Sequence, residues 1–179
     1  MGHHTLKFYS INQELILRIY MLGAKLARIP IAGRVVKAIM EWYARNQHSA
    51  WILTREEAKK IIDKATSIAV GDCKCRKVFK NCDNPLKTDI VLGMGYDVFM
   101  EVRKGEYKEI SKLEAKKIID ECSERGLVHT IVKCQDNFYA ICNYCSCCCV
   151  PLRLRREYGV KNVWKRNKDI LNKFLSSKT

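Results

Sequence analysis

The stretch EAKKIID, residues 57–63, recurs letter for letter at residues 114–120. Thr54 stands three residues before the glutamate of the first copy, and Ser111 three residues before that of the second, which is the spacing of a capping box at the start of a helix. β-rich residues and then cysteines follow each predicted helix. The repeat therefore predicts a duplicated helix–strand–cysteine unit, and with it an α+β fold in which helices pack on a small, mostly antiparallel sheet.

Local signals set the expected limits of the elements around this repeat. The first capped helix is expected to run to about Ala65 and to lead into a strand at SIAV, residues 67–70. The second is expected to end near Gly126, before a hairpin of residues 127–133 and 138–142. Gly93-x-Gly95 lacks the third glycine of a dinucleotide-binding turn, and we interpret it as a loop.

The flanks of the repeat have amphipathic patterns. Helices are predicted at residues 11–28 and 34–47, and a short basic helix in the tail from residue 160 to 179. We therefore divide the chain into an N-terminal amphipathic helical segment (1–50), a cysteine-rich domain (51–158) and a basic C-terminal helix (159–179). The N-terminal helices have the pattern of surface helices packed on a core, which we favour, and the same pattern also suits a membrane interface.

The net charge of +14 lies mainly in these flanks. Residues 1–48 hold 7 Lys and Arg against 2 Asp and Glu, residues 49–150 hold 17 against 15, and residues 151–179 hold 9 against 2. Basic flanks suit an acidic redox partner protein or peripheral contact with an anionic membrane, and they are also found as plain solvated surface. Nucleic acid is not expected as a partner, because no recognition-helix motif is visible and aromatic residues are not interleaved with the basic ones.

The sequence also indicates a cellular compartment. No apolar run approaches the ~18–20 residues of a membrane span, and the first residues do not have the pattern of a secretory signal. We therefore expect a cytoplasmic protein, either free or bound to the surface of a membrane. In a reducing cytoplasm a group of cysteines is more often a metal or redox site than a set of disulfides.

Eight of the ten cysteines form two groups. Cys122 and Cys134 lie outside the groups and are interpreted as small buried hydrophobic residues. If a helix begins near Cys145, three of the thiols fall on one of its faces. The first group is Cys73, Cys75 and Cys82, and the second is Cys142, Cys145, Cys147, Cys148 and Cys149.

Thiolates are soft donors that suit zinc and iron–sulfur clusters. A zinc ion takes four ligands and would leave several of the thiols unused, whereas eight grouped cysteines match one or two [4Fe–4S] clusters. The excess of cysteine and the lack of nearby histidine therefore favour iron–sulfur, with zinc as the second choice.

Three stretches carry a resemblance to a known family: GDCKCRKVFKNCDNPLKTDIVLG, EISKLEAKKIIDECSERGLVHTIV and AICNYCSCCCVPLRLR. They resemble the cysteine-rich ferredoxin-like [4Fe–4S] proteins of anaerobic bacteria and archaea, whose pattern is CxCR, a Cys with Pro, a capped helix, GLVH and CNCCxCCC. The resemblance covers roughly residues 54–158 and implies that the eight grouped cysteines bind the cluster, with Arg76 and His129 as motif residues. Asp89 and Tyr144 stand where relatives have cysteine, and the ferredoxin domain that commonly follows is not part of this chain.

The resemblance implies one-electron transfer in an anaerobe. Arg76 would donate hydrogen bonds to the cluster, and His129 would form a wall of the site rather than a ligand. One alternative is a redox enzyme with an open cluster iron, where Asp89 or a substrate would bind. A regulator whose cluster controls nucleic-acid binding, and a zinc-binding protein, are the others.

Overall fold

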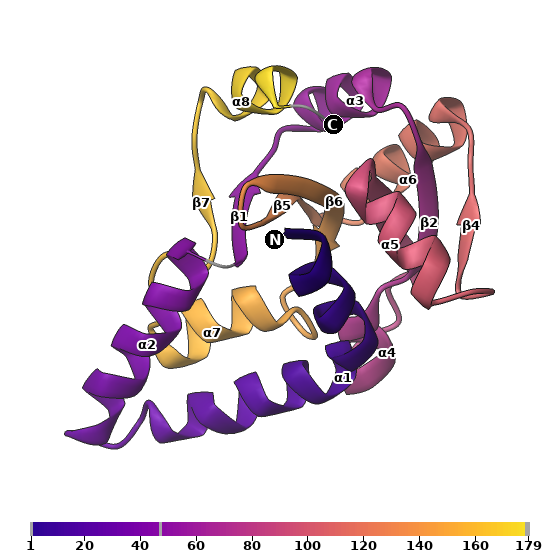
Figure 1. Cartoon of the computed structure of the whole chain (residues 1–179). Helices are drawn as coiled ribbons and strands as arrows, with labels where there is room; N and C mark the ends of the chain where they lie inside the picture. Colours follow the sequence, from indigo (N-terminus) through magenta and orange to yellow (C-terminus); the bar gives the residue numbers. More distant parts are fainter. Residues whose placement is uncertain (1, 47, 178–179) are drawn as a thin grey trace.

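The computed structural model describes residues 2–46 and 48–177, and its centre is a seven-stranded sheet (Figure 1). The strand order is β4-β2-β3-β6-β5-β1-β7. Neighbouring strands are antiparallel except β1 and β7, which are parallel. This confirms the predicted α+β fold with helices on a mostly antiparallel sheet. The strands are β1 (His48–Ile52), β2 (Ile68–Asp72), β3 (Lys87–Leu92), β4 (Tyr107–Glu109), β5 (Val128–Cys134), β6 (Asn137–Tyr144) and β7 (Lys165–Arg166).

The repeated sequence corresponds to a repeated topology. The copies of EAKKIID lie in α3 (Arg55–Lys64) and α6 (Lys112–Glu124). Each helix follows one strand and precedes two, so that the units are β1–α3–β2–β3 and β4–α6–β5–β6. The units exchange their first strands, because β1 pairs with β5 and β4 pairs with β2, while β3 and β6 pair at the centre. The duplicated unit therefore forms one interlocked sheet.

Ion pairs between α3 and α6 are reciprocal. Lys59 Nζ lies 2.6 Å from Asp120 Oδ1, and Lys116 Nζ lies 2.5 Å from Asp63 Oδ1. The two lysines hold the same position in the repeat, and so do the two aspartates. This is the pattern expected of two copies related by an approximate two-fold axis. The pairs are partly exposed, so each contributes little to stability.

Helices cover both faces of the sheet. α3, α6 and α8 (Ile170–Ser176) form one apolar cluster with Ile68 and Val70 of β2. α5 (Met94–Val102) and the first turns of α1 (Gly2–Leu26) form another, which includes Ala69. Neighbouring residues of a strand point to opposite faces, which explains why β2 contributes to both clusters.

The remaining helices lie beside the second face. α1 and α2 (Ala32–Asn46) meet at an acute turn, at the lower left of Figure 1. α7 (Val150–Tyr158) packs into the angle between them through Val150 and Leu154. α4 (Lys74–Phe79) follows β2 directly and contacts α1. No helix among the described residues has both the length and the apolar content needed to cross a membrane.

The capped helices and the hairpin were predictable from local sequence. Thr54 and Ser111 each accept a hydrogen bond from the backbone N–H of the glutamate three residues on, which confirms both capping boxes. Gly126 follows α6 with a φ of 68°, as expected of a residue that ends a helix. β5 and β6 form the predicted hairpin around Gln135.

The structure differs from the sequence analysis at three places. The condition of a helix beginning near Cys145 is not met: residues 146–148 form a turn, and α7 begins at Val150, with Cys149 as its N-cap and Pro151 in its first turn. Gly95 lies inside α5 rather than in a loop. The short helix predicted in the tail is α8, seven residues long, and the short strand β7 that precedes it was not predicted.

The three-segment division stays a prediction. β1 and the helices before it belong to the first segment, and β1 pairs with β5 of the second. β7 and α8 belong to the last segment, and they contact β1 and α3.

Two glycines inside helices offer a matched test of the packing. A Cβ at Gly95 would lie 2.0 Å from the backbone oxygen of Tyr139, whereas a Cβ at Gly23 would meet Met40 Cε at 3.6 Å, an ordinary contact. We expect Gly23→Ala to stabilise the protein by ~0.5–1 kcal/mol through helix propensity. Gly95→Ala should destabilise it by ~1–3 kcal/mol or more, because α5 must move off β6. Denaturant unfolding of both variants checks this, and equal effects would contradict the close approach.

Candidate metal centre

Three chain segments bring cysteines to one edge of the sheet. β2 ends at Asp72, opposite Lys87 at the start of β3. β6 runs antiparallel to β3, so it ends at Tyr144 on the same edge. Cys73 therefore follows β2 and Cys145 follows β6 at neighbouring places, and the segment between α4 and β3 carries Cys82 to them.

The duplication does not by itself explain this convergence. The topological counterpart of Cys73, at the end of β2, is Cys134 at the end of β5, which lies at the opposite edge of the sheet. The second cysteine group instead follows β6, the last strand of its unit. The two units therefore bring cysteines to one place from positions that are not equivalent in the repeat.

Four thiols form a compact group, which we call the cysteine centre. Its members are Cys82, Cys145, Cys147 and Cys148, and their Sγ atoms all lie within 4.8 Å of one another. Cys82 Sγ is 3.6 Å from Cys148 Sγ and 3.9 Å from Cys145 Sγ. Four thiols at such distances, contributed by two separate segments, can hold a metal ion.

The other four predicted cysteines lie around this centre. Cys149 Sγ is 3.8 Å from Cys145 Sγ, and the nearby thiols of Cys73 and Cys75 help to raise the pKa of Cys149. Cys142 points instead at Asp89, with its Sγ 3.5 Å from Asp89 Oδ1. The structure thus assembles one group of four, a second group of three in contact with it, and a separate thiol at Cys142.

Asp89 forms its hydrogen bonds with residues outside the cysteine centre. Its Oδ2 accepts a hydrogen bond from the Tyr107 hydroxyl at 2.6 Å, and burial raises the pKa of its carboxyl group. A role for Asp89 as a ligand of an open cluster iron has no support from this geometry.

Arg76 is a fully buried cation beside the thiols, with 1% of its surface exposed. Its guanidinium donates hydrogen bonds to the backbone oxygens of Pro85 and Asn143 and, at 2.6 Å, to Thr88 Oγ1. It also interacts with the Cys145 thiol, while its buried Nε has no hydrogen-bond partner in the described part of the chain. An unpartnered N–H and a positive charge at this place fit an anionic, thiolate-bound group.

The thiols of the cysteine centre titrate unequally. The pKa of Cys145 lies below its usual range, chiefly because its sulfur takes part in a hydrogen bond with Cys149, and Arg76 also lowers it. Burial raises the pKa of Cys148 above its usual range. Closely spaced thiolates repel one another, so a bound cation would relieve this conflict and release protons.

His129 is placed to orient a backbone rather than to bind a metal. Its Nδ1 lies 2.6 Å from Asn143 Oδ1, and its Nε2 lies 2.6 Å from Ser123 Oγ. Asn143 Nδ2 donates to the Thr88 oxygen, so Asn143 Oδ1 is an acceptor and Nδ1 of His129 carries the proton. Burial lowers the pKa of His129, which keeps the ring neutral. Both ring nitrogens are occupied, and the ring helps to fix the Asn143 backbone that Arg76 binds.

Three asparagines near the thiols were missed by sequence reasoning. The backbone N–H of Asn81 donates to Cys148 Sγ at 3.3 Å, and Asn84 Nδ2 donates to Cys82 Sγ at 3.4 Å. Asn143 links β6 to β3 through Thr88. Their signal in the sequence is position alone: two asparagines flank Cys82, and the third follows Cys142.

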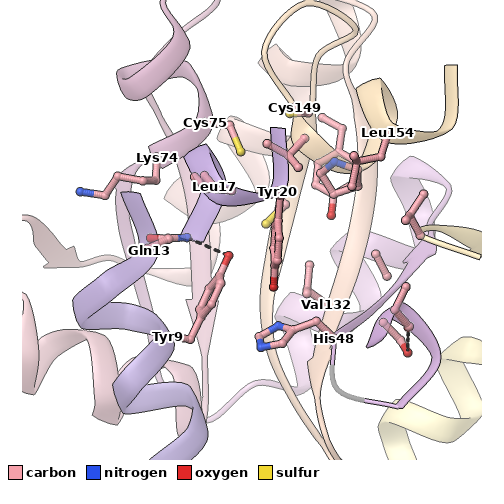
Figure 2. A pocket seen from close by; sticks show the side chains of 18 of the residues that line it. Tyr9, Gln13, Leu17, Tyr20, His48, Lys74, Cys75, Val132, Cys149 and Leu154 are labelled. Carbon is pink, nitrogen blue, oxygen red and sulfur yellow. Dashed lines mark hydrogen bonds between the residues drawn. The ribbon is translucent and has the colours of Figure 1, made fainter. Parts of the chain in front are cut away.

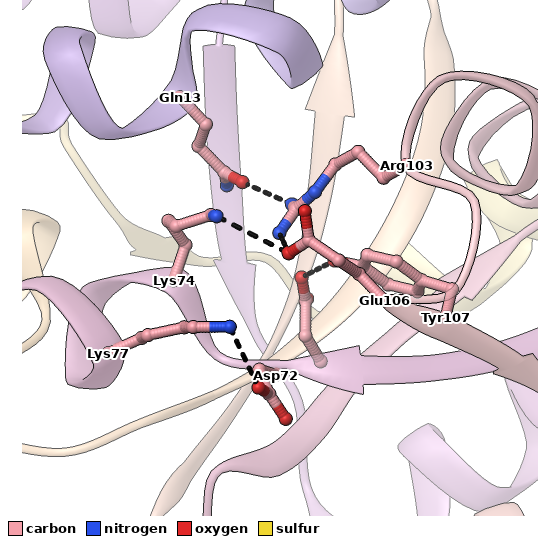
Figure 3. A network of polar contacts seen from close by, with 8 residues as sticks. Gln13, Asp72, Lys74, Lys77, Arg103, Glu106 and Tyr107 are labelled. Atoms are coloured by element: carbon pink, nitrogen blue, oxygen red, sulfur yellow. Dashed lines mark hydrogen bonds and ion pairs between the residues drawn. The ribbon is translucent and has the colours of Figure 1, made fainter.

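A polar network fixes α4, the helix that carries Cys75 and Arg76 (Figure 3). Lys74 lies 3.5 Å from Glu106, which also pairs with Arg103 at 2.5 Å. Arg103 reaches Gln13 of α1 at 2.8 Å. The Arg103 guanidinium lowers the pKa of Glu106 to about 2, so the carboxylate stays charged in this network.

Cys122 and Cys134 are buried in the core, as the sequence predicted. Burial raises the pKa of each thiol to about 11. They belong to the apolar cluster between α1, α5 and the sheet.

No protein-family model, curated protein or solved structure matches this chain.

Proposed function

We propose that the cysteine centre binds an iron–sulfur cluster and that the protein transfers single electrons. The observation that carries this proposal is the number of thiols: three more, those of Cys73, Cys75 and Cys149, adjoin the four of the centre. One tetrahedral metal ion would leave them without a role. A thiolate-bound [4Fe–4S] cluster supplies one-electron chemistry when it is bound.

The residues of the chain would each have a definite part in this function. The four thiolates hold the cluster, and Arg76 offsets its negative charge and presents an N–H, both of which ease reduction. Asn81 and Asn84 donate to two of the sulfurs and so tune their electron density. Cys145 and Cys148 are buried, whereas Cys82 and Cys147 are partly exposed, which leaves the centre close to a surface that a redox partner can approach.

A zinc site is the second candidate, and the spacing of the sulfurs favours it. Zinc–sulfur bonds of about 2.3 Å place the thiolates of one tetrahedral ion ~3.8 Å apart. The Cys82–Cys148 and Cys82–Cys145 separations, 3.6 and 3.9 Å, lie close to that value. The thiolates of a cluster bind four different irons and so lie farther apart, which means that the centre must widen to accept one.

Metal analysis of the full chain, purified without oxygen, decides between these candidates. Iron, acid-labile sulfide and zinc are measured per chain, with EPR of the reduced protein. Iron and sulfide in equal amounts, together with the signal of a reduced cluster, support electron transfer. Zinc without iron, or one iron without sulfide, contradicts it in favour of a single-ion site.

A further inference from the structure

The exposed apolar side chains of the described residues are concentrated on one surface. Fourteen large apolar residues are exposed, and eleven of them lie between residues 8 and 42. We call these eleven the apolar stripe, and their exposed fractions run from 48% to 85%. They are Phe8, Ile11, Leu15, Ile19, Leu22, Leu26, Ile29, Ile31, Val35, Ile39 and Trp42.

The spacing of the stripe puts it on one side of each helix. Successive members in α1 are three or four residues apart, which places them on one helical face, and the same holds in α2. The opposite face of α1 is the buried one, with Leu6, Leu17 and Met21 in the core. The stripe is therefore a second apolar face on α1, whose opposite face already packs in the core, and it continues along α2.

The charges around the stripe indicate what covers it. Lys25, Arg28 and Arg34 surround the turn between α1 and α2, which presents Ile29 and Ile31. The acids of this region are engaged: Glu14 pairs with Arg18, and Glu41 accepts a hydrogen bond from the Lys161 backbone. An apolar projection ringed by cations is complementary to acyl chains under anionic headgroups.

We propose that α1 and α2 dock on the surface of an anionic lipid bilayer, with the turn between them inserted at the headgroup level. The helices lie along the membrane and do not cross it. This proposal does not depend on which metal the cysteine centre holds.

Vesicle co-sedimentation of the full chain tests the docking. We expect binding to vesicles of phosphatidylcholine mixed with phosphatidylglycerol, and binding at least ~30-fold weaker, the effect of losing the attraction of two cations, to phosphatidylcholine alone. Ile31→Glu should weaken binding at least about tenfold, and Arg28→Gln with Arg34→Gln about 30-fold. Leu113→Glu, an equally drastic change at an exposed leucine of α6, is the matched control and should bind normally.

Two results overturn the proposal. One is that the protein binds neither kind of vesicle. The other is a dimer in sedimentation equilibrium that Ile31→Glu dissociates, because the stripe is then a contact between two copies of the chain.

A separate observation, a cavity of about 430 Å³ between α1, α2 and the sheet, carries a second inference (Figure 2). Its walls are mainly apolar, and its volume lies in the range of small-molecule sites. Ile19 and Ile39, two exposed members of the apolar stripe, line it, so the cavity opens on the stripe. Cys75 and Cys142 also line the cavity.

Aromatic side chains line the cavity around His48, and the buried carboxyl group of Asp89 is also part of its wall. His48 lies in an aromatic group, stacked on Tyr43 at 5.7 Å and tilted against Tyr9 at 4.6 Å between ring centroids. Burial lowers the pKa of His48 to about 4, so the imidazole is neutral, and its buried Nε2 has no hydrogen-bond partner in the part of the chain that the structure describes. A flat neutral ring with a carbonyl group would stack on these aromatics and pair with the imidazole.

We infer that the cavity binds a neutral, lipid-soluble molecule with a carbonyl-bearing ring, of the quinone class. The inference concerns binding alone, which is measured whether or not the cysteine centre proves to hold iron.

Equilibrium dialysis with a short-chain benzoquinone, with oleate as an anionic comparison, tests the site. We expect the quinone to bind and oleate to bind at least tenfold more weakly. His48→Phe should lower quinone affinity by ~2–10-fold, the effect of one hydrogen bond, whereas the exposed His4→Phe should change nothing. Met40→Trp, which fills the space between α1 and α2, should abolish binding. Equal affinity in all variants, or preference for oleate, overturns the inference.

Discussion

Cys145→Ser is expected to lower the metal affinity of the cysteine centre by about 100-fold or more. Changes in the outer shell of a metal site already cost ~10–100-fold, and this one removes a ligand. Cys145 is also the thiol that joins the two groups, since it lies 3.9 Å from Cys82 Sγ and 3.8 Å from Cys149 Sγ. Serine keeps the shape but offers a hard, protonated oxygen where a soft metal needs sulfur. Metal content per chain and chelator competition measure the change.

Two further variants make this result interpretable. Cys134→Ala removes a thiol at the opposite edge of the sheet and should leave the metal content unchanged. Cys142→Ser tests the thiol that faces Asp89 rather than the centre, and it should retain the metal as well. Full metal binding by Cys145→Ser would show that the four-thiol group is not the site, and loss of metal in Cys142→Ser would place Cys142 among the ligands.

The parts of the fold that could be predicted are those decided by short segments. A capping box needs four consecutive residues, and a hairpin needs a turn between two β-rich runs, so Thr54, Ser111 and the turn at Gln135 were readable. The exact repeat identified the duplication, because identical helices must find equivalent neighbours. The exchange of first strands between the units depends on pairings across the whole sheet, which no local pattern records.

The sequence predicted that cysteines form the candidate site, but not which of the cysteines come together in space. The spacing of the cysteines indicated a metal site, and four of the eight lie in one compact group. Which four depends on the pairing of β2, β3 and β6, because β2 and β6 end at the edge of the sheet where β3 begins. The considered helix at Cys145 does not form, since the chain turns there beside Cys82 and Cys149 caps the helix that follows. His129, which was expected to form a wall of the site, hydrogen-bonds to the side chain of Asn143. The backbone oxygen of Asn143 in turn accepts a hydrogen bond from Arg76.

Arg76→Met is expected to destabilise the protein by ~3–5 kcal/mol, the largest stability effect among these substitutions. Methionine fills similar apolar space but leaves the oxygens of Pro85, Thr88 and Asn143 buried without a donor, and each such loss costs ~1–3 kcal/mol. A domain of this size has roughly 5–15 kcal/mol in total, so the variant should unfold at a much lower denaturant concentration. Urea unfolding of the chain with and without its metal measures the difference.

Arg76→Lys separates the charge from the geometry of the guanidinium. Lysine keeps the positive charge, but one ammonium group cannot reach acceptors on β3, β6 and the preceding loop together, so it should recover less than half of the loss. Arg18→Met is the matched control, because Arg18 forms an exposed pair with Glu14 that contributes at most ~0.5 kcal/mol. If Arg76→Met and Arg18→Met unfold alike, the buried guanidinium does not hold the ends of β3 and β6 together. If only Arg76→Met is destabilised, the cation at the cysteine centre is also what positions the strands that deliver its ligands.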